Sequence, residues 1–280
     1  MTKRINKFPT LSTDISLVDT HCHLDMKTYS DDLEAVLDRA VEHGVRHTIT
    51  IGIDLESSIR AIGLARKYDC LSATVGVHPH DVDEAGPDTY TALAELVDAN
   101  RDLVVGYGEI GLDYFKEYSA AENQRIHFAN QLSLARELRL PVVIHDREAH
   151  EDTLRIIKAS GAAEFGGVMH CFSGDLQFAE QVLDLGFYIS FPGVVTFKNA
   201  LDLQEVAKAI PIESMLIETD GPYLAPHPMR GKRNEPVNVL YSAAHIAGLR
   251  EISLDEVARQ TTANATRLFR LPTIHPGEGS

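Results

Sequence analysis

Short apolar segments alternate with amphipathic segments along almost the whole of this chain, and the alternation repeats eight times. The apolar segments are nearly continuous in hydrophobicity, which is typical of strands buried on both faces of a parallel sheet. We expect strands at 15–18, 45–51, 71–77, 103–107, 142–144, 166–169, 187–191 and 215–217. The apolar residues of the other segments recur at helical spacing, and we expect helices at 31–43, 55–68, 89–99, 120–138, 148–160, 176–185, 201–209, 237–249 and 254–268.

Eight strand–helix units within about 250 residues predict an α/β fold, a (β/α)8 TIM barrel closed as a single domain. A doubly wound open sheet is the alternative, but no G-x-G-x-x-G motif or P-loop follows any predicted strand. We expect the barrel to span residues 17–271, after an N-terminal extension at 1–16 to which we assign no role. The Pro- and Gly-rich tail at 272–280 is expected to be flexible.

The charge balance narrows the range of partners. The chain has 26 basic and 41 acidic residues and a formal net charge of −15, which argues against a broad basic face for nucleic acid. A phosphate-bearing substrate is still compatible, because bound divalent cations can reverse the sign of a site. No segment approaches the roughly 20 apolar residues that span a bilayer, and the N-terminus lacks the apolar part of a secretory signal. Three cysteines fit no disulfide framework, so we expect a cytoplasmic protein.

Polar side chains with metal-ligating chemistry follow the predicted strands. The active site of a TIM barrel lies at the carboxyl ends of its strands. His21 and His23 come after the first strand and share one side of its alternation. The fourth, fifth, sixth and eighth strands are followed by Glu109, His145, His170 and Asp220. Only a closed barrel brings all six side chains to one opening, so the pattern predicts a metal site there.

Six nitrogen and oxygen ligands are more than one tetrahedral ion takes, which suggests two divalent ions bridged by a carboxylate. Glu109 is the expected bridge, because its strand lies between the others around the ring. His21, His23 and Asp220 would hold one ion, since the first and eighth strands are neighbours in a closed barrel. The other ion would be held by His145 and His170. Such a centre activates water, and Asp220 could accept the proton of that water.

Six motifs that contain these residues resemble the TatD family of metal-dependent deoxyribonucleases, within the amidohydrolase-like TIM-barrel superfamily. They lie at 20–25, 76–80, 108–114, 143–147, 170–174 and 217–224, in family order, and the resemblance covers about residues 17 to 270. It implies a (β/α)8 barrel, two divalent metal ions (Mg²⁺, Mn²⁺ or Zn²⁺), and phosphodiester hydrolysis in DNA, often as a 3′→5′ exonuclease in DNA repair or degradation. The family's ligands fall on the same six residues, His21, His23, Glu109, His145, His170 and Asp220.

Three further residues are candidates for contacting the substrate. The family counterpart of His78 approaches the substrate phosphate, although a structural His in a His-Pro turn is an equal alternative. Arg147 shares the alternation of His145 and could bind a phosphate bidentately, or form a salt bridge at the barrel opening. Arg233, in the basic cluster 230–233, is our candidate for the nucleic-acid backbone; the alternative is a solvated loop that caps the next helix.

Some neighbouring residues have weaker assignments. The aromatic residues Tyr114, Phe115 and Tyr223 could stack on bases, although aromatic side chains near barrel loops more often pack. Glu218 has the alternation of Asp220 but lies deeper along the strand, and we interpret it as structural or as supporting a ligand.

Three classes of function fit these observations to different degrees. The first is a two-metal phosphodiesterase that acts on single-stranded DNA or its 3′ ends, with no membrane and no obligatory protein partner. The second is a related hydrolase of a small lactone, amide or phosphotriester; such enzymes often use a carboxylated Lys as metal bridge, but Glu109 stands there instead. The third is a non-catalytic barrel with structural metals. Structural sites are usually closed and do not recruit six ligands at a barrel opening, which argues against it.

Overall fold

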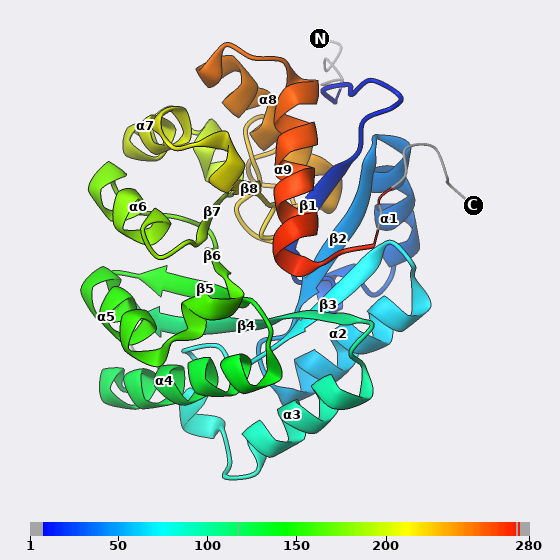
Figure 1. Ribbon diagram of the computed structural model, residues 1–280. Coiled ribbons are helices and arrows are strands. Elements are labelled where there is room, and N and C mark those ends of the chain that lie inside the picture. Colours follow the sequence, from blue (N-terminus) through cyan, green and yellow to red (C-terminus); the bar gives the residue numbers. More distant parts are fainter. Residues whose placement is uncertain (1–7, 117, 273, 275–280) are drawn as a thin grey trace.

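Eight parallel strands form one sheet in strict chain order, from β1 to β8, and helices surround them (Figure 1). This computed structural model describes residues 8–116, 118–272 and 274. The strands are β1 (Leu17–Cys22), β2 (Val45–Ile51), β3 (Leu71–Val75), β4 (Val104–Asp113), β5 (Val142–Arg147), β6 (Gly167–Met169), β7 (Tyr188–Phe191) and β8 (Met215–Ile217). The predicted (β/α)8 TIM barrel is confirmed.

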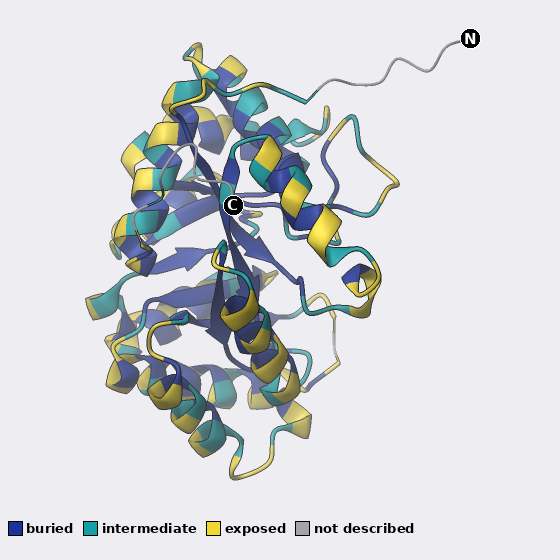
Figure 2. Ribbon diagram, turned by 90° about the vertical axis from the view of Figure 1, so that its right-hand side faces the viewer, coloured by how far each residue is buried: buried dark blue, intermediate teal, exposed yellow. Residues whose placement is uncertain are grey.

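The helices lie outside the strands, with their buried faces inward and their exposed faces in solvent (Figure 2). They are α1 (Leu33–Glu42), α2 (Leu55–Lys67), α3 (Thr89–Ala99), α4 (Ala121–Leu138), α5 (His150–Ser160), α6 (Leu176–Leu183), α7 (Leu201–Ala209), α8 (Val239–Arg250) and α9 (Leu254–Phe269). Polar side chains cap the N-termini of some of these helices. Asp54 accepts from the Ser57 amide at α2, and Asp175 accepts from the Phe178 amide at α6.

The barrel closes between β1 and β8 without a regular ladder. A single bridge joins Cys22 to Gly221, and the Asp220 amide donates to the carbonyl of His21 at 2.9 Å. Deeper in the same seam, the Asp19 carboxylate accepts from the amide of Thr219 at 2.8 Å and from its hydroxyl at 2.6 Å. Backbone and side-chain hydrogen bonds therefore hold the first and last strands together.

One end of the barrel interior is packed with apolar side chains. Val143, Val168 and Leu216 belong to a buried cluster that also contains Phe269, from the end of α9. Strand residues two positions apart share a face, so the next inward positions on these strands hold His145, His170 and Glu218. Two residues further along each of these strands, the inward side chains thus change from apolar to potentially metal-ligating. A metal site inside the barrel must therefore lie at the carboxyl ends of the strands.

Three strands extend beyond the ends that we predict from hydrophobicity. We predict ends at Val18, Tyr107 and Ile144, but β1, β4 and β5 continue to Cys22, Asp113 and Arg147. The added residues stay in the ladder, where Gly111 pairs with His145 and Asp113 pairs with Arg147, and in β4 polar residues alternate with the buried apolar Ile110 and Leu112. Glu109, Asp113 and His145 line the cavity at the barrel opening, where polar groups are tolerated, so loss of hydrophobicity does not mark the end of these strands.

The described part of the N-terminal extension packs on the barrel. The amide of Ser12 donates to Asp255 at the start of α9, and Ile15 is buried in the core. The predicted flexible tail at 272–280 lies largely outside the described residues, because positions 273 and 275–280 are not described. Among the described helices, none is long and apolar enough to cross a membrane.

Candidate metal centre

A cavity of about 920 Å³ opens at the carboxyl ends of the strands. Its walls include five of the six predicted ligands, namely His23, Glu109, His145, His170 and Asp220. The sixth, His21, is fully buried and stacks on His170. The structure thus brings together all six ligands that the strand ends predict, and the described residues contain groups of His, Asp and Glu that could hold a metal ion.

The first ligand group consists of His21, His23 and Asp220. The two Nε2 atoms are 3.3 Å apart, and Oδ1 of Asp220 lies 3.8 Å from that of His21 and 3.4 Å from that of His23. Atoms that each lie about 2.1 Å from a tetrahedral ion are about 3.4 Å from one another. The spacing of these three ligand atoms therefore fits a single divalent cation.

The second ligand group consists of His145 and His170. Nδ1 of His145 lies 2.8 Å from Oε1 of Glu109, and Nε2 of His170 lies 3.0 Å from the same oxygen. The other oxygen, Oε2, faces the first ligand group at 3.4 Å from Nε2 of His21 and 3.7 Å from Nε2 of His23. Each oxygen of Glu109 thus faces a different ligand group, which is the arrangement expected of a bridging carboxylate.

The backbone around Glu109 places this carboxylate at the barrel centre. Gly108 and Gly111 both have φ of +147°, a region that side chains rarely adopt, and a Cβ at either position would collide with backbone oxygens of β5. Only glycine allows β4 to lie this close to β5. Burial alone would raise the pKa of Glu109, but the imidazoles of His170 and His78 outweigh it and keep that pKa well below its usual range.

Asp113 is a site residue that is not among the six ligands predicted from the strand ends. Its Oδ2 lies 3.1 Å from Nε2 of His145 and 2.9 Å from Nε2 of His80. Burial alone would lower the pKa of His145, but hydrogen bonds to Asp113 and Glu109 raise it to about 9. Asp113 therefore orients the ring whose other nitrogen faces Glu109. The signal was available in the sequence, since Glu109, Gly111 and Asp113 alternate on one face of a strand.

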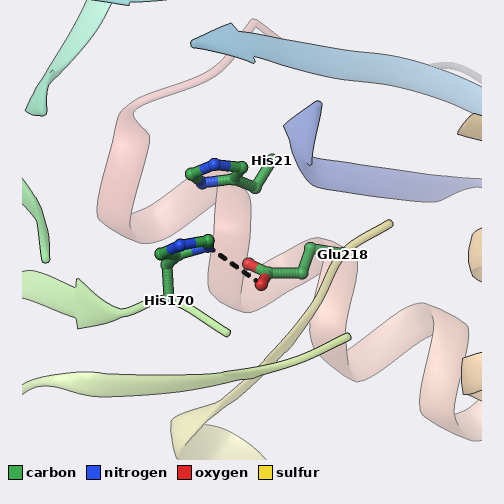
Figure 3. A group of neighbouring side chains, drawn as sticks. All are labelled: His21, His170 and Glu218. Atoms are coloured by element: carbon green, nitrogen blue, oxygen red, sulfur yellow. Dashed lines mark hydrogen bonds and ion pairs between the residues drawn. The ribbon is translucent and has the colours of Figure 1, made fainter. Parts of the chain in front are cut away.

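Glu218 orients the ring of His170 as Asp113 orients the ring of His145. Its Oε1 lies 3.1 Å from Nδ1 of His170 and accepts from the amide of Cys171 at 2.7 Å (Figure 3). Burial alone would lower the pKa of His170, but the carboxylates of Glu109 and Glu218 raise it well above its usual range. The interpretation of Glu218 as a residue that supports a ligand agrees with this position.

His78 lies beside the second ligand group, and a hydrogen bond from the backbone fixes the position of its ring proton. Its Nε2 lies 3.4 Å from Oε1 of Glu109, and its Nδ1 accepts a hydrogen bond from the amide of His80 at 3.1 Å. A neutral imidazole that accepts at Nδ1 carries its proton on Nε2. Burial lowers the pKa of His78 to about 4, so the ring is neutral at physiological pH. His78 therefore points an N–H donor, not a lone pair, into the cavity.

The two predicted arginine contacts differ in position. Arg147 lines the cavity, and its guanidinium lies 3.8 Å from the centre of the Phe115 ring. Arg233 does not line it. The Arg233 guanidinium donates to both oxygens of Asp32, at 2.8 and 2.6 Å, and to Glu235 at 3.0 Å. The predicted contact of Arg233 with a DNA backbone would require exchange of these bonds and stays a prediction.

The aromatic residues that could stack on bases also differ in position. Tyr223 lines the cavity with 51% of its surface exposed, and Phe115 is 49% exposed beside Arg147. Tyr118, which the sequence analysis does not consider, is 67% exposed and lines the same cavity. The hydroxyl of Tyr114 instead donates to Asp152 at 2.7 Å, which fixes its ring against α5. Two aromatic surfaces, Tyr118 and Tyr223, are thus available in the cavity, Phe115 is available beside Arg147, and Tyr114 has a packing role.

Known proteins resemble this chain over most of its length. The family model described as "TatD related DNase" matches residues 18–270. The uncharacterised metal-dependent hydrolase YabD of Bacillus subtilis is 44% identical over 91% of this chain and 99% of that protein. YcfH of Escherichia coli K12, also named a metal-dependent hydrolase, is 39% identical over 91% of this chain and 96% of its own length.

The fold also resembles solved structures over most of the chain. The crystal structure of YjjV, a TatD homologue from Escherichia coli K12, superposes with a TM-score of 0.87 and 34% identity. It covers 91% of this chain, which covers 98% of YjjV in turn. Sequence and structure therefore agree over the region that contains the barrel and all six ligands.

Proposed function

Because this chain belongs to the TatD family of metal-dependent hydrolases, we propose that it hydrolyses phosphodiester bonds in DNA with two divalent metal ions. The observation that carries the proposal is the position of Glu109, whose two oxygens face different ligand groups. A single carboxylate between two sets of imidazoles is the expected design of a binuclear hydrolytic centre. A Lys-bridged hydrolase of lactones or phosphotriesters would need a different residue here.

The donor set indicates which residues would hold the ions. His21, His23 and Asp220 would bind one, His145 and His170 the other, and Glu109 would contribute one oxygen to each. Imidazole and carboxylate ligands are compatible with Zn²⁺ and Mn²⁺, and the carboxylates with Mg²⁺. Ions at such a centre act as Lewis acids that stabilise charge on phosphoryl oxygens and make water more acidic. Two cations would also offset the acidic charge of the chain near an anionic substrate.

The protein side chains would supply binding and proton transfer. His78 presents Nε2–H to the cavity and would donate to a non-bridging phosphate oxygen. Arg147, beside Phe115, would bind a neighbouring phosphate. Asp220 lies at the edge of the first ligand group, where it would accept the proton of the attacking water.

The exposed rim supports an unpaired DNA end as substrate. Tyr118 and Tyr223 line the cavity and are more than half exposed, and Phe115 is 49% exposed beside Arg147, which also lines it. Aromatic side chains stack on bases that are not paired or buried in a duplex. We therefore propose a single strand or 3′ end as the preferred substrate, cleaved in the 3′→5′ direction, and a role in DNA repair or degradation.

Hydrolysis of a 5′-labelled single-stranded oligonucleotide with Mg²⁺, Mn²⁺ or Zn²⁺ tests this proposal. We expect stepwise shortening from the 3′ end, and its loss in Glu109→Ala and Asp220→Ala. Glu164→Ala is the matched control, because it removes a carboxylate that pairs with Arg136 outside the cavity. A lactone and a phosphotriester should be assayed in parallel. Metal-dependent turnover of either, without DNA cleavage, would replace the nuclease proposal with the alternative hydrolase.

A further inference from the structure

Glu218 uses only one of its two carboxylate oxygens in the hydrogen bonds formed by the described residues. Oε1 accepts from Nδ1 of His170 and from the amide of Cys171. Oε2 has no partner among the described residues, although Glu218 is only 1% exposed. A buried carboxylate oxygen without a hydrogen bond is costly, so a donor is expected close to it.

Nδ1 of His21 is the candidate for this donor. It is buried and also lacks a partner within the described part of the chain. The rings of His21 and His170 are stacked, with centres 3.8 Å apart and planes 12° apart (Figure 3). One ligand atom from each of His21, His170 and Glu218 lies within 4.8 Å of the others. Two buried polar atoms without a partner among the described residues, Nδ1 of His21 and Oε2 of Glu218, thus belong to one cluster of neighbouring side chains.

We propose that Glu218 positions one histidine from each ligand group, with Oε1 holding Nδ1–H of His170 and Oε2 holding Nδ1–H of His21. The second contact is made directly or through one buried water. This inference rests on the proposed binuclear centre, because it assigns the two rings to different ions. Glu218 touches neither ion nor substrate, so it is a positioning residue.

The consequence is control of both tautomers by one carboxylate. A proton held on Nδ1 leaves Nε2 of the neutral ring as a lone pair, which a metal ligand requires. In both rings Nε2 is the atom that faces Glu109. Glu218 therefore keeps one ligand atom unprotonated in each group, and it links the two groups from beneath the centre.

A third cation among these residues would explain the same cluster less well. Ions on Nδ1 as well as Nε2 would require each neutral ring to lose its one N–H proton and become an imidazolate. A carboxylate that accepts from Nδ1–H needs no such loss and is the usual partner of a metal-bound histidine. The amide of Cys171 already donates to Oε1, and this contact also favours an acceptor role for Glu218.

Glu218→Gln separates the two contacts. The amide oxygen should stay at the Oε1 position, because two donors, His170 and the Cys171 amide, converge there. The amide NH₂ then faces Nδ1 of His21, which must become an acceptor and move its proton to Nε2. We expect this variant to lose the first ion selectively. Glu218→Ala removes both contacts and should weaken both ions.

Titration of the full chain with Mn²⁺ or Zn²⁺, followed by calorimetry and metal analysis, measures both sites without any nuclease assay. We expect two ions per wild-type chain. In Glu218→Gln, binding at one site should weaken by roughly 10- to 100-fold and change much less at the other. Glu235→Gln is the isosteric control, with Tm and circular dichroism as checks on folding. Two sites of wild-type affinity in Glu218→Gln would overturn the proposal.

NMR of the imidazole protons of the Zn²⁺-loaded chain gives a second measurement. Its signals would not change if Glu218 had only a structural role. Slowly exchanging Nδ1-bound protons are expected for both His21 and His170 in the wild type, and for His170 alone in Glu218→Gln. Loss of both signals together, or of neither, would reject the proposed division between the two oxygens. Because neither experiment uses DNA, failure of the proposed nuclease function would leave both results interpretable.

Discussion

The carboxylate of Asp113 lies 3.1 Å from Nε2 of His145, on the opposite edge of the ring from the nitrogen that faces Glu109. The other oxygen of Asp113 accepts from the amides of Phe115 and Lys116, at 3.0 and 2.8 Å. The same side chain therefore fixes the loop after β4 and the orientation of one proposed metal ligand.

Asp113→Asn should uncouple these two roles. The amide oxygen can still bind the loop amides, but its NH₂ faces His145 and drives the ring proton to Nδ1, the ligand atom. We expect affinity for the second ion to fall by roughly 10- to 100-fold, measured by metal titration. Asp83→Asn, which alters a carboxylate bonded to Asn123 on the same side of the barrel, is the control and should retain both ions. Unchanged metal affinity in Asp113→Asn would contradict this role.

The stability of the metal-free protein should depend on pH through His145. Its pKa is raised to about 9 from a usual 6.5, so the folded state binds this proton more tightly than the unfolded state. The resulting stabilisation is complete below about pH 6.5 and is lost as the pH rises through 9. We expect the Tm of metal-free protein to fall across this interval in calorimetry, and less so in His145→Gln. Equal slopes for the two proteins would refute the assignment.

Substitution of Arg147 and of Arg233 by alanine should have different effects on DNA binding and on the Tm. Arg147→Ala removes a cation at the cavity and should weaken binding of single-stranded DNA, lowering the slope of log affinity against log salt by about one. Arg233→Ala should lower the Tm, because it breaks the pair with Asp32, and leave that slope unchanged. A salt titration of fluorescent oligonucleotide binding distinguishes them. A lower slope in Arg233→Ala would instead support its predicted contact with DNA.

Gly111→Ala should disrupt the site through the backbone. A Cβ there would strike the carbonyl oxygen of His145, and a φ of +147° is strained for alanine. We expect a loss of about 1–3 kcal/mol of unfolding free energy from the strain alone. Gly63→Ala is the matched comparison, because no atom lies within 4 Å of its added Cβ in α2, and it should stabilise by about 0.5–1 kcal/mol. Urea denaturation measures both. Equal effects would reject the argument from close approach.

The convergence of the six proposed ligands was predictable from sequence, because a barrel brings residues that follow successive strands to the same opening. His21 and Asp220 are almost 200 positions apart, and only closure of the ring brings them together. Strand ends were less predictable, since Glu109 and His145 continue their ladders although they are polar. Hydrophobicity reports burial against apolar neighbours, and it carries no information about a polar residue that faces a polar cavity.

Contacts made by side chains from separate loops were not predictable. The pairing of Arg233 with Asp32 depends on how the long loop after β8 folds back on the start of α1. Similarly, the proton position on His78 follows from one amide of its own turn, which no pattern of residue types specifies. Sequence spacing indicates which residues reach the opening, but loop conformation decides what each of them contacts there.

The seam between β1 and β8 makes the proposed centre depend on closure of the barrel. The amide of Asp220 bonds to the carbonyl of His21 in that seam, so two members of the first ligand group come from the two strands that close the ring. A partly folded chain with an open seam would therefore have no complete first site. An ion bound there would link the first and last strands of the sheet and stabilise the closed barrel against their separation.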